Sequence, residues 1–231
     1  MKTIKNESLI KRNGRIGQFT TLGALAVLGI GMYISLQQTA LLFYSIAALI
    51  VGFGLMQIGM FFTSRWGRSP RADEELDAAL KGLPGDTSLY HYETPVPHLL
   101  IGPAGVWILR TYHQRGHIAF TKNRWRLTRG GFMQGYMTIF GQEGIGRPDL
   151  EIANDLDSMR KYFAKHLGET AIPYLQAALI FTNEKLEIDA SDFPMPALKL
   201  KQLKEFIRKK SKDRILGSAV LEELTSFLPQ E

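Results

Sequence analysis

The sequence predicts a hairpin of two transmembrane helices followed by a cytosolic α/β domain with a mixed sheet. Residues 16–64 contain no charged side chain. This stretch holds two apolar runs, 16–36 and 39–62, and each is long enough as a helix to cross the roughly 30 Å hydrocarbon core of a bilayer. The rest of the chain alternates helix-like and strand-like patterns, which is typical of one α/β domain.

Basic residues flank the apolar stretch on both sides, and none lies in the short step between the two runs. By the positive-inside rule, both termini are expected in the cytoplasm, which makes the chain a multi-pass protein of a bacterial inner membrane. A signal peptide is the rival interpretation of the first run, but its apolar core is too long and a second run follows at once. The flanking residues are Lys2, Lys5, Lys11, Arg12 and Arg15 before the runs and Arg65, Arg68 and Arg71 after them.

Four segments are expected: a basic cytosolic N-terminus (1–15), the hairpin (16–62), a linker (63–70) and the domain (71–231). The chain carries a formal net charge of +6, mostly next to the hairpin, where it suits anionic lipid headgroups. The domain is close to neutral, unlike a typical nucleic-acid-binding protein. The chain contains no cysteine, which excludes disulfides and thiolate metal sites.

The domain is expected to begin with a helix that starts at Ser69-Pro70 and stops at Pro84-Gly85, with an apolar stripe from Leu76 to Leu83. Turn residues at 102–105 and 122–123 then join short strands as a meander. The expected strands are 87–93, 98–101, 106–111, 117–121 and 124–128.

A glycine-rich excursion loop is expected over 129–148. A long helix then begins at Pro148-Asp149. Its inward face is expected to carry Leu150, Ala153, Leu156, Met159 or Arg160, and Phe163. The continuously apolar run 174–182 predicts a buried strand. Two closing helices are expected over 199–212 and 215–228.

Several of these segments resemble the nuclease-related domain (NERD) family, which is similar to restriction endonucleases. The resemblance covers roughly residues 71–210. It rests on the acidic first helix, on Pro97–Arg110 (PHLLIGPAGVWILR), on Arg147–Glu151 (RPDLE) and on Ala178–Asn183 (ALIFTN). It implies a restriction-endonuclease-like fold with a mixed sheet.

The resemblance also implies metal-dependent phosphodiester cleavage, in which carboxylates hold Mg²⁺ and a lysine steadies the nucleophile. Three of the implied core positions carry the wrong chemistry here, so we expect a degenerate site with no catalytic residue and no cofactor. The family positions fall on Glu74 or Glu75 (helix acid), Pro97 (aspartate), Arg110 (glutamate), Tyr112 (lysine) and Glu151 (glutamine).

The residues alone lead to the same expectation. No aspartate or glutamate lies between Glu93 and Glu143, so no carboxylate on these strands can hold a divalent ion. The segment instead carries six cations among aromatic residues, a composition that suits phosphate and base contacts. The alternative to nucleic-acid binding is an ordinary exposed surface whose positive charge is balanced by the acidic residues of 143–192. The six cations are Arg110, Arg115, Lys122, Arg124, Arg126 and Arg129.

Two further patterns favour ordinary structural roles. His91, His98, His113 and His117 are expected to be surface or turn residues, because their spacing does not suit a metal site outside a helix. Glycines within the spans permit close helix contact, within the hairpin or between protomers.

The leading hypothesis is therefore a membrane-anchored, non-catalytic nuclease-related domain that binds or scaffolds at the cytosolic membrane face. The expected partners are the lipid bilayer and a protein, while nucleic acid and a second copy of the chain are left open. A membrane-tethered nucleic-acid-binding protein is the second hypothesis. The third is an active nuclease with a relocated metal site drawing on Glu74, Glu75, Glu93 or Glu151.

Overall fold

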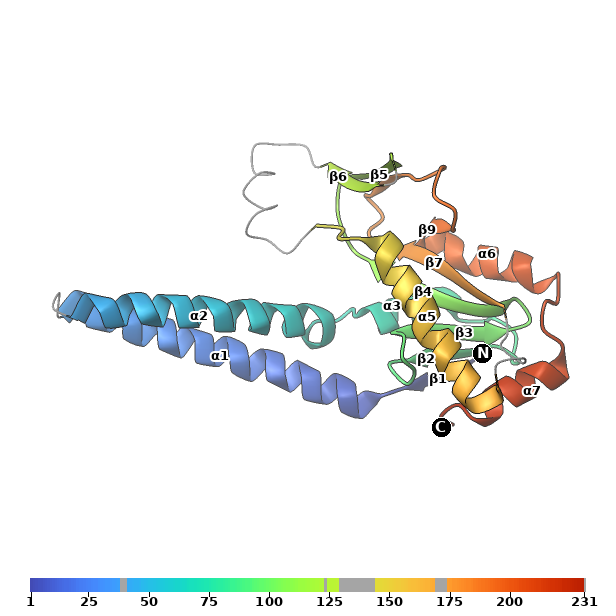
Figure 1. Cartoon of the computed structure of the whole chain (residues 1–231), viewed down its shortest axis with the longest axis horizontal. Coiled ribbons are helices and arrows are strands. Elements are labelled where there is room, and N and C mark those ends of the chain that lie inside the picture. The colour runs from blue at the N-terminus through green and yellow to red at the C-terminus, as the bar shows by residue number, and fades with distance from the viewer. Residues whose placement is uncertain (38–40, 123, 129–143, 169–173, 231) are drawn as a thin grey trace. The chain divides into compact units, whose positions relative to one another are not determined.

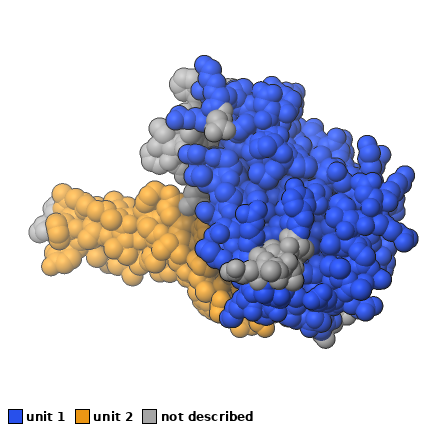
Figure 2. Space-filling model, turned by 45° about the vertical axis from the view of Figure 1, so that its right-hand side comes forward, with its two compact units in different colours: residues 1–5, 75–231 blue, residues 6–74 orange. Residues whose placement is uncertain are grey.

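The computed structural model describes residues 1–37, 41–122, 124–128, 144–168 and 174–230. The chain forms two compact units, which Figure 2 shows in different colours: Asn6–Glu74, and Met1–Lys5 together with Glu75–Glu231. We call them the hairpin unit and the α/β unit. Most of the glycine-rich segment expected to form a loop, 129–143, lies outside the described residues.

The hairpin unit contains α1 (Glu7–Gln37), α2 (Leu42–Phe62) and a short π-helix, η2 (Thr63–Gly67). The two apolar runs are thus helical, as expected. Helix α1 begins well before its apolar run, because the Asn6 side chain accepts a hydrogen bond from the Leu9 backbone N–H at 2.9 Å and so caps the helix. The expected linker at 63–70 begins with η2.

Small residues allow α1 and α2 to approach closely in antiparallel directions. A Cβ atom added at Gly31 would lie 2.6 Å from Cβ of Ala48, and one added at Gly52 would lie 2.6 Å from the Leu28 side chain. These glycines are therefore needed for contact within the hairpin. Three others have open space around them and are not used in this way: Gly23, Gly29 and Gly54.

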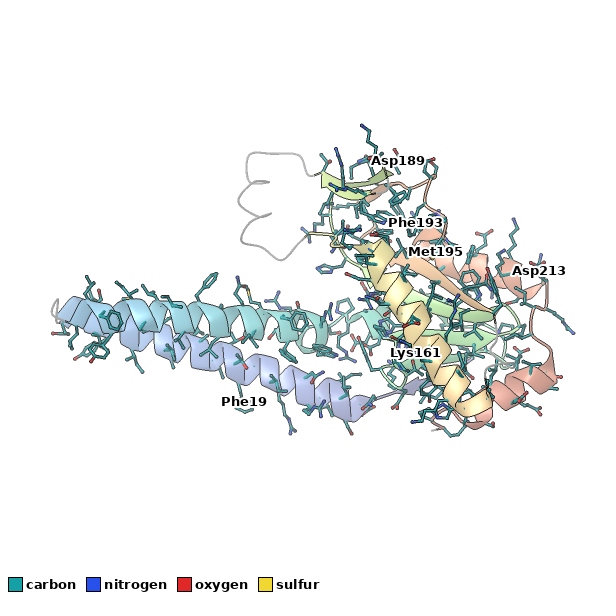
Figure 3. The ribbon with its side chains drawn as sticks, viewed as in Figure 1. Phe19, Lys161, Asp189, Phe193, Met195 and Asp213 are labelled. Atoms are coloured by element: carbon teal, nitrogen blue, oxygen red, sulfur yellow. The ribbon has the colours of Figure 1, made fainter. Side chains whose placement is uncertain are left out.

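The exposed surface of the hairpin unit is apolar along the two runs, between its charged ends. Phe19 is 71% exposed and Phe43 is 78% exposed, and Figure 3 shows Phe19 directed away from the hairpin. Both helices are long and apolar enough to cross a membrane, and only 11% of each candidate span is buried. The core helix of a soluble protein would instead be mostly buried.

The α/β unit contains a six-stranded sheet in the order β1-β2-β3-β4-β7-β9 (Figure 1). Strands β2, β3 and β4 form an antiparallel meander, and the other neighbours are parallel. The strands are β1 (Lys2–Lys5), β2 (Ser88–His91), β3 (His98–Gly102), β4 (Gly105–Tyr112), β7 (Leu175–Phe181) and β9 (Ala197–Lys199).

Helices cover both faces of this sheet. Because side chains alternate along a strand, Leu100 and Trp107 face a core that includes residues of α3 and α6, while Ile101 and Ile108 face a core that includes residues of α5 and α7. The expected sheet with helices on either side is confirmed. The helices are α3 (Ala72–Leu80), α5 (Pro148–Leu167), α6 (Leu200–Ser211) and α7 (Ser218–Ser226).

A second, three-stranded sheet has the order β6-β5-β8. It consists of β5 (His117–Thr121), β6 (Arg124–Thr128) and β8 (Glu187–Asp189). Phe193, labelled in Figure 3, packs its ring 4.9 Å from that of Phe120 and 4.8 Å from that of Trp125. The rings of Phe120 on β5 and Trp125 on β6 also pack against each other, 5.2 Å apart.

The structure corrects three details of the expected strand arrangement. The meander does not continue into β5, because β4 pairs instead with the buried parallel strand β7. Strands β8 and β9 were not expected, since each has only three residues. The N-terminal segment, expected to be a separate basic tail, contributes β1, which pairs in parallel with β2.

The inward face of helix α5 differs from the expected one in its first turns. Leu150 is 50% exposed and Ala153 is also exposed, whereas Ile152 is fully buried. Met159 and Phe163 are fully buried, as expected. Glu151 contacts a residue of opposite charge on β4. The expected face was chosen from apolar residues alone and so missed this polar contact.

Candidate functional site

Four side chains meet between β4 and α5, and we call them the Arg110 cluster: Arg110, Tyr112, Glu151 and Asp155. Arg110 and Tyr112 are two residues apart on β4, so both side chains project from the same face of the sheet. Glu151 and Asp155 are four residues apart on α5, which places them on one side of the helix.

The geometry of the Arg110 cluster is that of a closed ion-pair network. Arg110 Nη2 lies 3.0 Å from Glu151 Oε2, and Arg110 Nη1 lies 3.1 Å from Asp155 Oδ2. The Tyr112 hydroxyl donates to the same Glu151 oxygen at 2.8 Å. The guanidinium therefore bridges two carboxylates, one of which also accepts a bond from the tyrosine.

Partial burial shapes the titration of this cluster. The side chains of Arg110 and Asp155 are only 21% and 14% exposed. Burial raises the pKa of Asp155 even though the Arg110 charge lowers it, and the pKa of Arg110 rises because two carboxylates outweigh its own burial. Burial and the Glu151 charge also raise the pKa of Tyr112. Arg110 is therefore a permanent cation and Tyr112 a neutral donor.

The structure brings together three positions that the family resemblance singled out: Arg110, Tyr112 and Glu151. Pro97 lies just before β3, and its carbonyl accepts a hydrogen bond from the Tyr92 N–H at 2.9 Å. No acid replaces the missing aspartate at that position. A guanidinium thus stands where the family pattern implies a metal-binding carboxylate.

The candidate acids of the first helix have different partners. Glu74 belongs to the hairpin unit, and hydrogen bonds from Ser69 and Arg71 lower its pKa. Glu75 belongs to the α/β unit, and burial raises its pKa despite a hydrogen bond from the Thr182 side chain. Within the part of the chain that the structure describes, no three histidine, aspartate or glutamate side chains gather in a way that would hold a metal ion.

The structure describes five of the six candidate nucleic-acid-binding cations, and Arg129 lies outside the described residues. Arg110 is paired with Glu151 and Asp155 of α5, and Arg115 also has an interaction partner. Lys122, Arg124 and Arg126 are exposed at the β5–β6 hairpin.

Acidic residues share the small sheet with these exposed cations. Asp189 of β8 and Arg126 of β6 both pair with Ala119 of the central strand β5, and Glu187 of β8 pairs with His117 of β5. Glu187 and Asp189 are both exposed. The small sheet therefore carries both positive and negative charges, which is consistent with a surface whose cations are balanced by acidic residues.

A second polar network, which we call the histidine chain, contains Lys5, Asp77, His91 and His98. His91 and His98 are cross-strand neighbours on β2 and β3, and their Nδ1 atoms lie 2.7 Å apart. His91 Nε2 lies 3.1 Å from Asp77 Oδ1 on α3, and Lys5 of β1 forms an ion pair with Asp77.

The histidine chain corrects a sequence-based expectation. His91 and His98 were expected at the surface or in turns, yet their exposed fractions are 0% and 2%. Their burial is tolerated because the two Nδ1 atoms form a hydrogen bond with each other, and Asp77 satisfies Nε2 of His91. His117 lies on β5, and His113 follows β4.

Sequence reasoning missed three residues of these networks. Asp155 follows Glu151 by four residues, so a search for polar pairs on the α5 face would have found it. Asp77 and Lys5 left no comparable local signal, because their partners lie far away in the sequence.

Comparisons with known proteins found no matching family model, no matching curated protein and no matching solved structure.

Proposed function

We propose that this chain is a membrane-anchored, non-catalytic protein of the nuclease-related type that binds or scaffolds a partner at the cytosolic face of the inner membrane. The observation that carries the proposal is the Arg110 cluster. It occupies the strand and helix positions that the family pattern assigns to hydrolysis, and it is an internal clasp between β4 and α5.

The chemistry of the cluster opposes metal-assisted hydrolysis. A divalent ion would have to compete with a guanidinium that lies 3.0 Å from Glu151 and 3.1 Å from Asp155. The positive charge of Arg110 repels a cation, and removing Arg110 from both carboxylates would leave partly buried charges unpaired, which is costly. Glu151 and Asp155 thus serve as partners of Arg110 in this proposal rather than as metal ligands.

The placement of β1 supports the proposed membrane topology. Residues before the hairpin (β1) and after it (β2) pair within one sheet. If the two helices span a bilayer, both ends of the hairpin must therefore lie on the same side. The basic residues at both ends favour the cytosolic side.

The topology predicts a specific labelling pattern in spheroplasts. The chain has no cysteine, so a single introduced cysteine is the only thiol. A cysteine replacing Gln37, at the end of α1, reacts with a membrane-impermeant maleimide from outside. A cysteine replacing Lys161, exposed on α5 and labelled in Figure 3, reacts only after permeabilisation. The reverse pattern, or equal labelling of both, contradicts the proposed anchoring.

The non-catalytic role predicts that the purified full-length protein does not cut supercoiled plasmid with Mg²⁺ or Mn²⁺. It also predicts no DNA or RNA affinity that falls with salt, because Arg110 is already paired and the exposed cations of the small sheet share it with Glu187 and Asp189. Cross-linking in cells should instead recover a protein partner with the full chain and not with a chain ending at Glu74.

Two results would contradict this role. The first is metal-dependent strand cleavage that Glu151→Gln abolishes, which would favour the relocated-site hypothesis. The second is salt-dependent nucleic-acid binding that an Arg124→Gln, Arg126→Gln variant loses, which would favour the tethered nucleic-acid-binding protein.

A further inference from the structure

Helix α6 and the residues that follow it carry an unbalanced positive charge. Segment 200–214 contains seven basic residues and two acidic ones, Glu205 and Asp213. We call five basic residues of this segment, together with one from the adjacent turn after α3, the α6 surface. All of them except Lys204 are exposed. The α6 surface consists of Lys81, Lys201, Lys204, Arg208, Lys209 and Lys212.

Several exposed cations elsewhere in the α/β unit have acidic partners close by. Lys161 lies 2.7 Å from Asp157, and Arg147 lies 3.0 Å from Asp149. In the part of the chain that the structure describes, no carboxylate forms an ion pair with the α6 surface. Its positive charge is therefore available to an acidic partner.

Two cations of the α6 surface are held in place by neutral acceptors. Lys204 Nζ donates to the Lys81 carbonyl, and Arg208 Nη2 donates to the Gly82 carbonyl at 3.3 Å. These carbonyls follow the last turn of α3, where the helix dipole favours cations. The two side chains are thus positioned while their net charge remains uncompensated.

The first turn of α6 carries a charge that opposes the stability of its own helix. Lys201 is the second residue of α6, and no acidic residue lies in that turn. A cation there faces the positive end of the helix dipole, whereas Arg208 and Lys209 in the last turn lie at the favourable end. Such conflicts with local stability are expected where a residue serves binding.

We propose that the α6 surface binds a carboxylate-rich helical segment of a cytosolic protein partner. The inference rests on the binding or scaffolding role proposed above and names the chemistry of the partner. Carboxylates three or four residues apart on a partner helix repeat with the same rise as the cations of α6, so two helices side by side can form several ion pairs. The row of cations along α6 is Lys201, Lys204, Arg208 and Lys212.

Helix α6 starts at the edge of the sheet where the chain connects to the hairpin unit. Strands β1, β2, β4, β7 and β9 run in one direction, and β3 runs opposite to them. Lys5 ends β1, and Glu75 is hydrogen-bonded to Thr182, which follows β7. Both connections therefore lie at the carboxyl edge of these strands, and so does Leu200, which follows β9.

The α6 surface extends away from this edge. Arg208 contacts the Gly82 carbonyl, which precedes β2, so α6 runs toward the amino edge of the sheet. Arg208 lies about 10 Å and Lys212 about 16 Å beyond Lys201 along the helix. Surface charges act over about 8 Å at physiological salt, so lipid charges next to the connections do not neutralise the far half of the surface. This geometry favours a soluble partner over the bilayer.

The α6 surface lacks the aromatic groups that accompany binding of single-stranded nucleic acids. Phe206 is the only aromatic residue in segment 200–214, and its ring packs 5.2 Å from that of the buried Trp107. Single strands are held partly by bases that stack on exposed aromatic rings. A row of cations without such rings is better matched by carboxylates.

Binding of a short fluorescent peptide to the full-length protein in phosphatidylcholine nanodiscs tests the inference. The peptide carries glutamate at every third or fourth position among alanines, and a matched peptide carries glutamine instead. Fluorescence anisotropy should show binding of the glutamate peptide and not of the glutamine peptide. The affinity should fall about tenfold when NaCl rises from about 50 to 300 mM, because salt screens the charges.

Charge reversal tests whether the peptide binds at the α6 surface. Lys201→Glu combined with Lys212→Glu should weaken binding of the glutamate peptide about tenfold. Both side chains are exposed, so the variant is expected to fold, which circular dichroism checks. Lys165→Glu combined with Lys185→Glu changes the net charge equally at other exposed positions and is expected to keep the affinity within about twofold.

Single cysteines test whether lipid headgroups cover the α6 surface instead. The chain has no cysteine, so Lys209→Cys and Lys165→Cys each introduce the only thiol, on α6 and on α5. The ratio of their maleimide labelling rates should be the same in phosphatidylcholine discs and in discs that contain phosphatidylglycerol. Selective protection of the Lys209→Cys thiol by the anionic lipid would overturn the inference in favour of the bilayer.

Three further results would overturn the inference. They are no binding of the glutamate peptide at low salt, equal losses in the two double variants, and tighter binding of single-stranded DNA that Lys201→Glu with Lys212→Glu removes. Absence of peptide binding leaves the proposed function standing, because a partner can dock elsewhere. Plasmid cleavage by the full chain, in contrast, overturns the proposed function and leaves the peptide result unaffected.

Discussion

Replacement of Arg110 by methionine is expected to lower the free energy of unfolding of the α/β unit by about 3 kcal/mol. The substitution leaves Asp155, which is only 14% exposed, and Glu151 as neighbouring carboxylates without their shared cation. For a chain of this size, the melting temperature should fall by about 6–12 °C. Circular dichroism of the full-length protein in detergent micelles during heating measures this change.

Two comparisons separate this effect from a general loss of charge. Arg124→Met removes an exposed arginine on β6 and is expected to change stability by less than about 0.5 kcal/mol. Combining Arg110→Met with Glu151→Leu and Asp155→Leu removes the unpaired carboxylates and should restore most of the stability. If Arg110→Met is no more harmful than Arg124→Met, the cluster does not clasp α5 to the sheet.

Replacement of Ile4 by aspartate is expected to lower the free energy of unfolding of the α/β unit by about 4 kcal/mol. Ile4 is 7% exposed and belongs to the core on the α5 face of the sheet. The change removes buried apolar surface and places a charge there without a partner. It should also accelerate hydrogen exchange of β2, which loses its neighbour at that edge.

The matched control is Lys2→Asp, which introduces the same side chain on the same strand. Lys2 is exposed, so its replacement is expected to have a small effect on melting temperature and on exchange of β2. Equal effects of the two variants would show that β1 does not contribute to the core in the full-length protein. The comparison therefore tests directly whether the N-terminus is part of the folded domain.

Local patterns in the sequence were sufficient for much of the fold. The apolar runs predicted α1 and α2, and short β-type runs bounded by turn residues predicted β2 to β6 to within a few residues at each end. Proline at 148 predicted the start of α5. These signals work because helix and strand periodicity, turn residues and hydropathy act over a few neighbouring positions.

Strand β1 shows where such reasoning stops. Its sequence, Lys2-Thr-Ile-Lys5, is short and mostly polar, and its partner residues 88–91 lie more than eighty positions further along the chain. An intervening hairpin makes the pairing still less apparent. The same limit applies to β8 and β9, which have three residues each and pair with longer strands that are distant in the sequence.

The candidate site was anticipated in its positions but not in its contacts. Arg110, Tyr112 and Glu151 were named from a family pattern, and the lack of acids between Glu93 and Glu143 was visible in the sequence. The sequence did not reveal that Arg110 bridges Glu151 and Asp155, because this contact depends on which side of α5 faces β4.

The linear chain thus specified two membrane-length helices, an α/β domain and a strand segment devoid of acids, since hydropathy, periodicity and composition are properties of neighbouring residues. The tertiary structure then determined which charged side chains form ion pairs. It joined the N-terminus to the sheet, closed Arg110 onto α5 and buried two histidines against each other. Burial and ion pairing depend on distances between remote residues, which no local pattern contains.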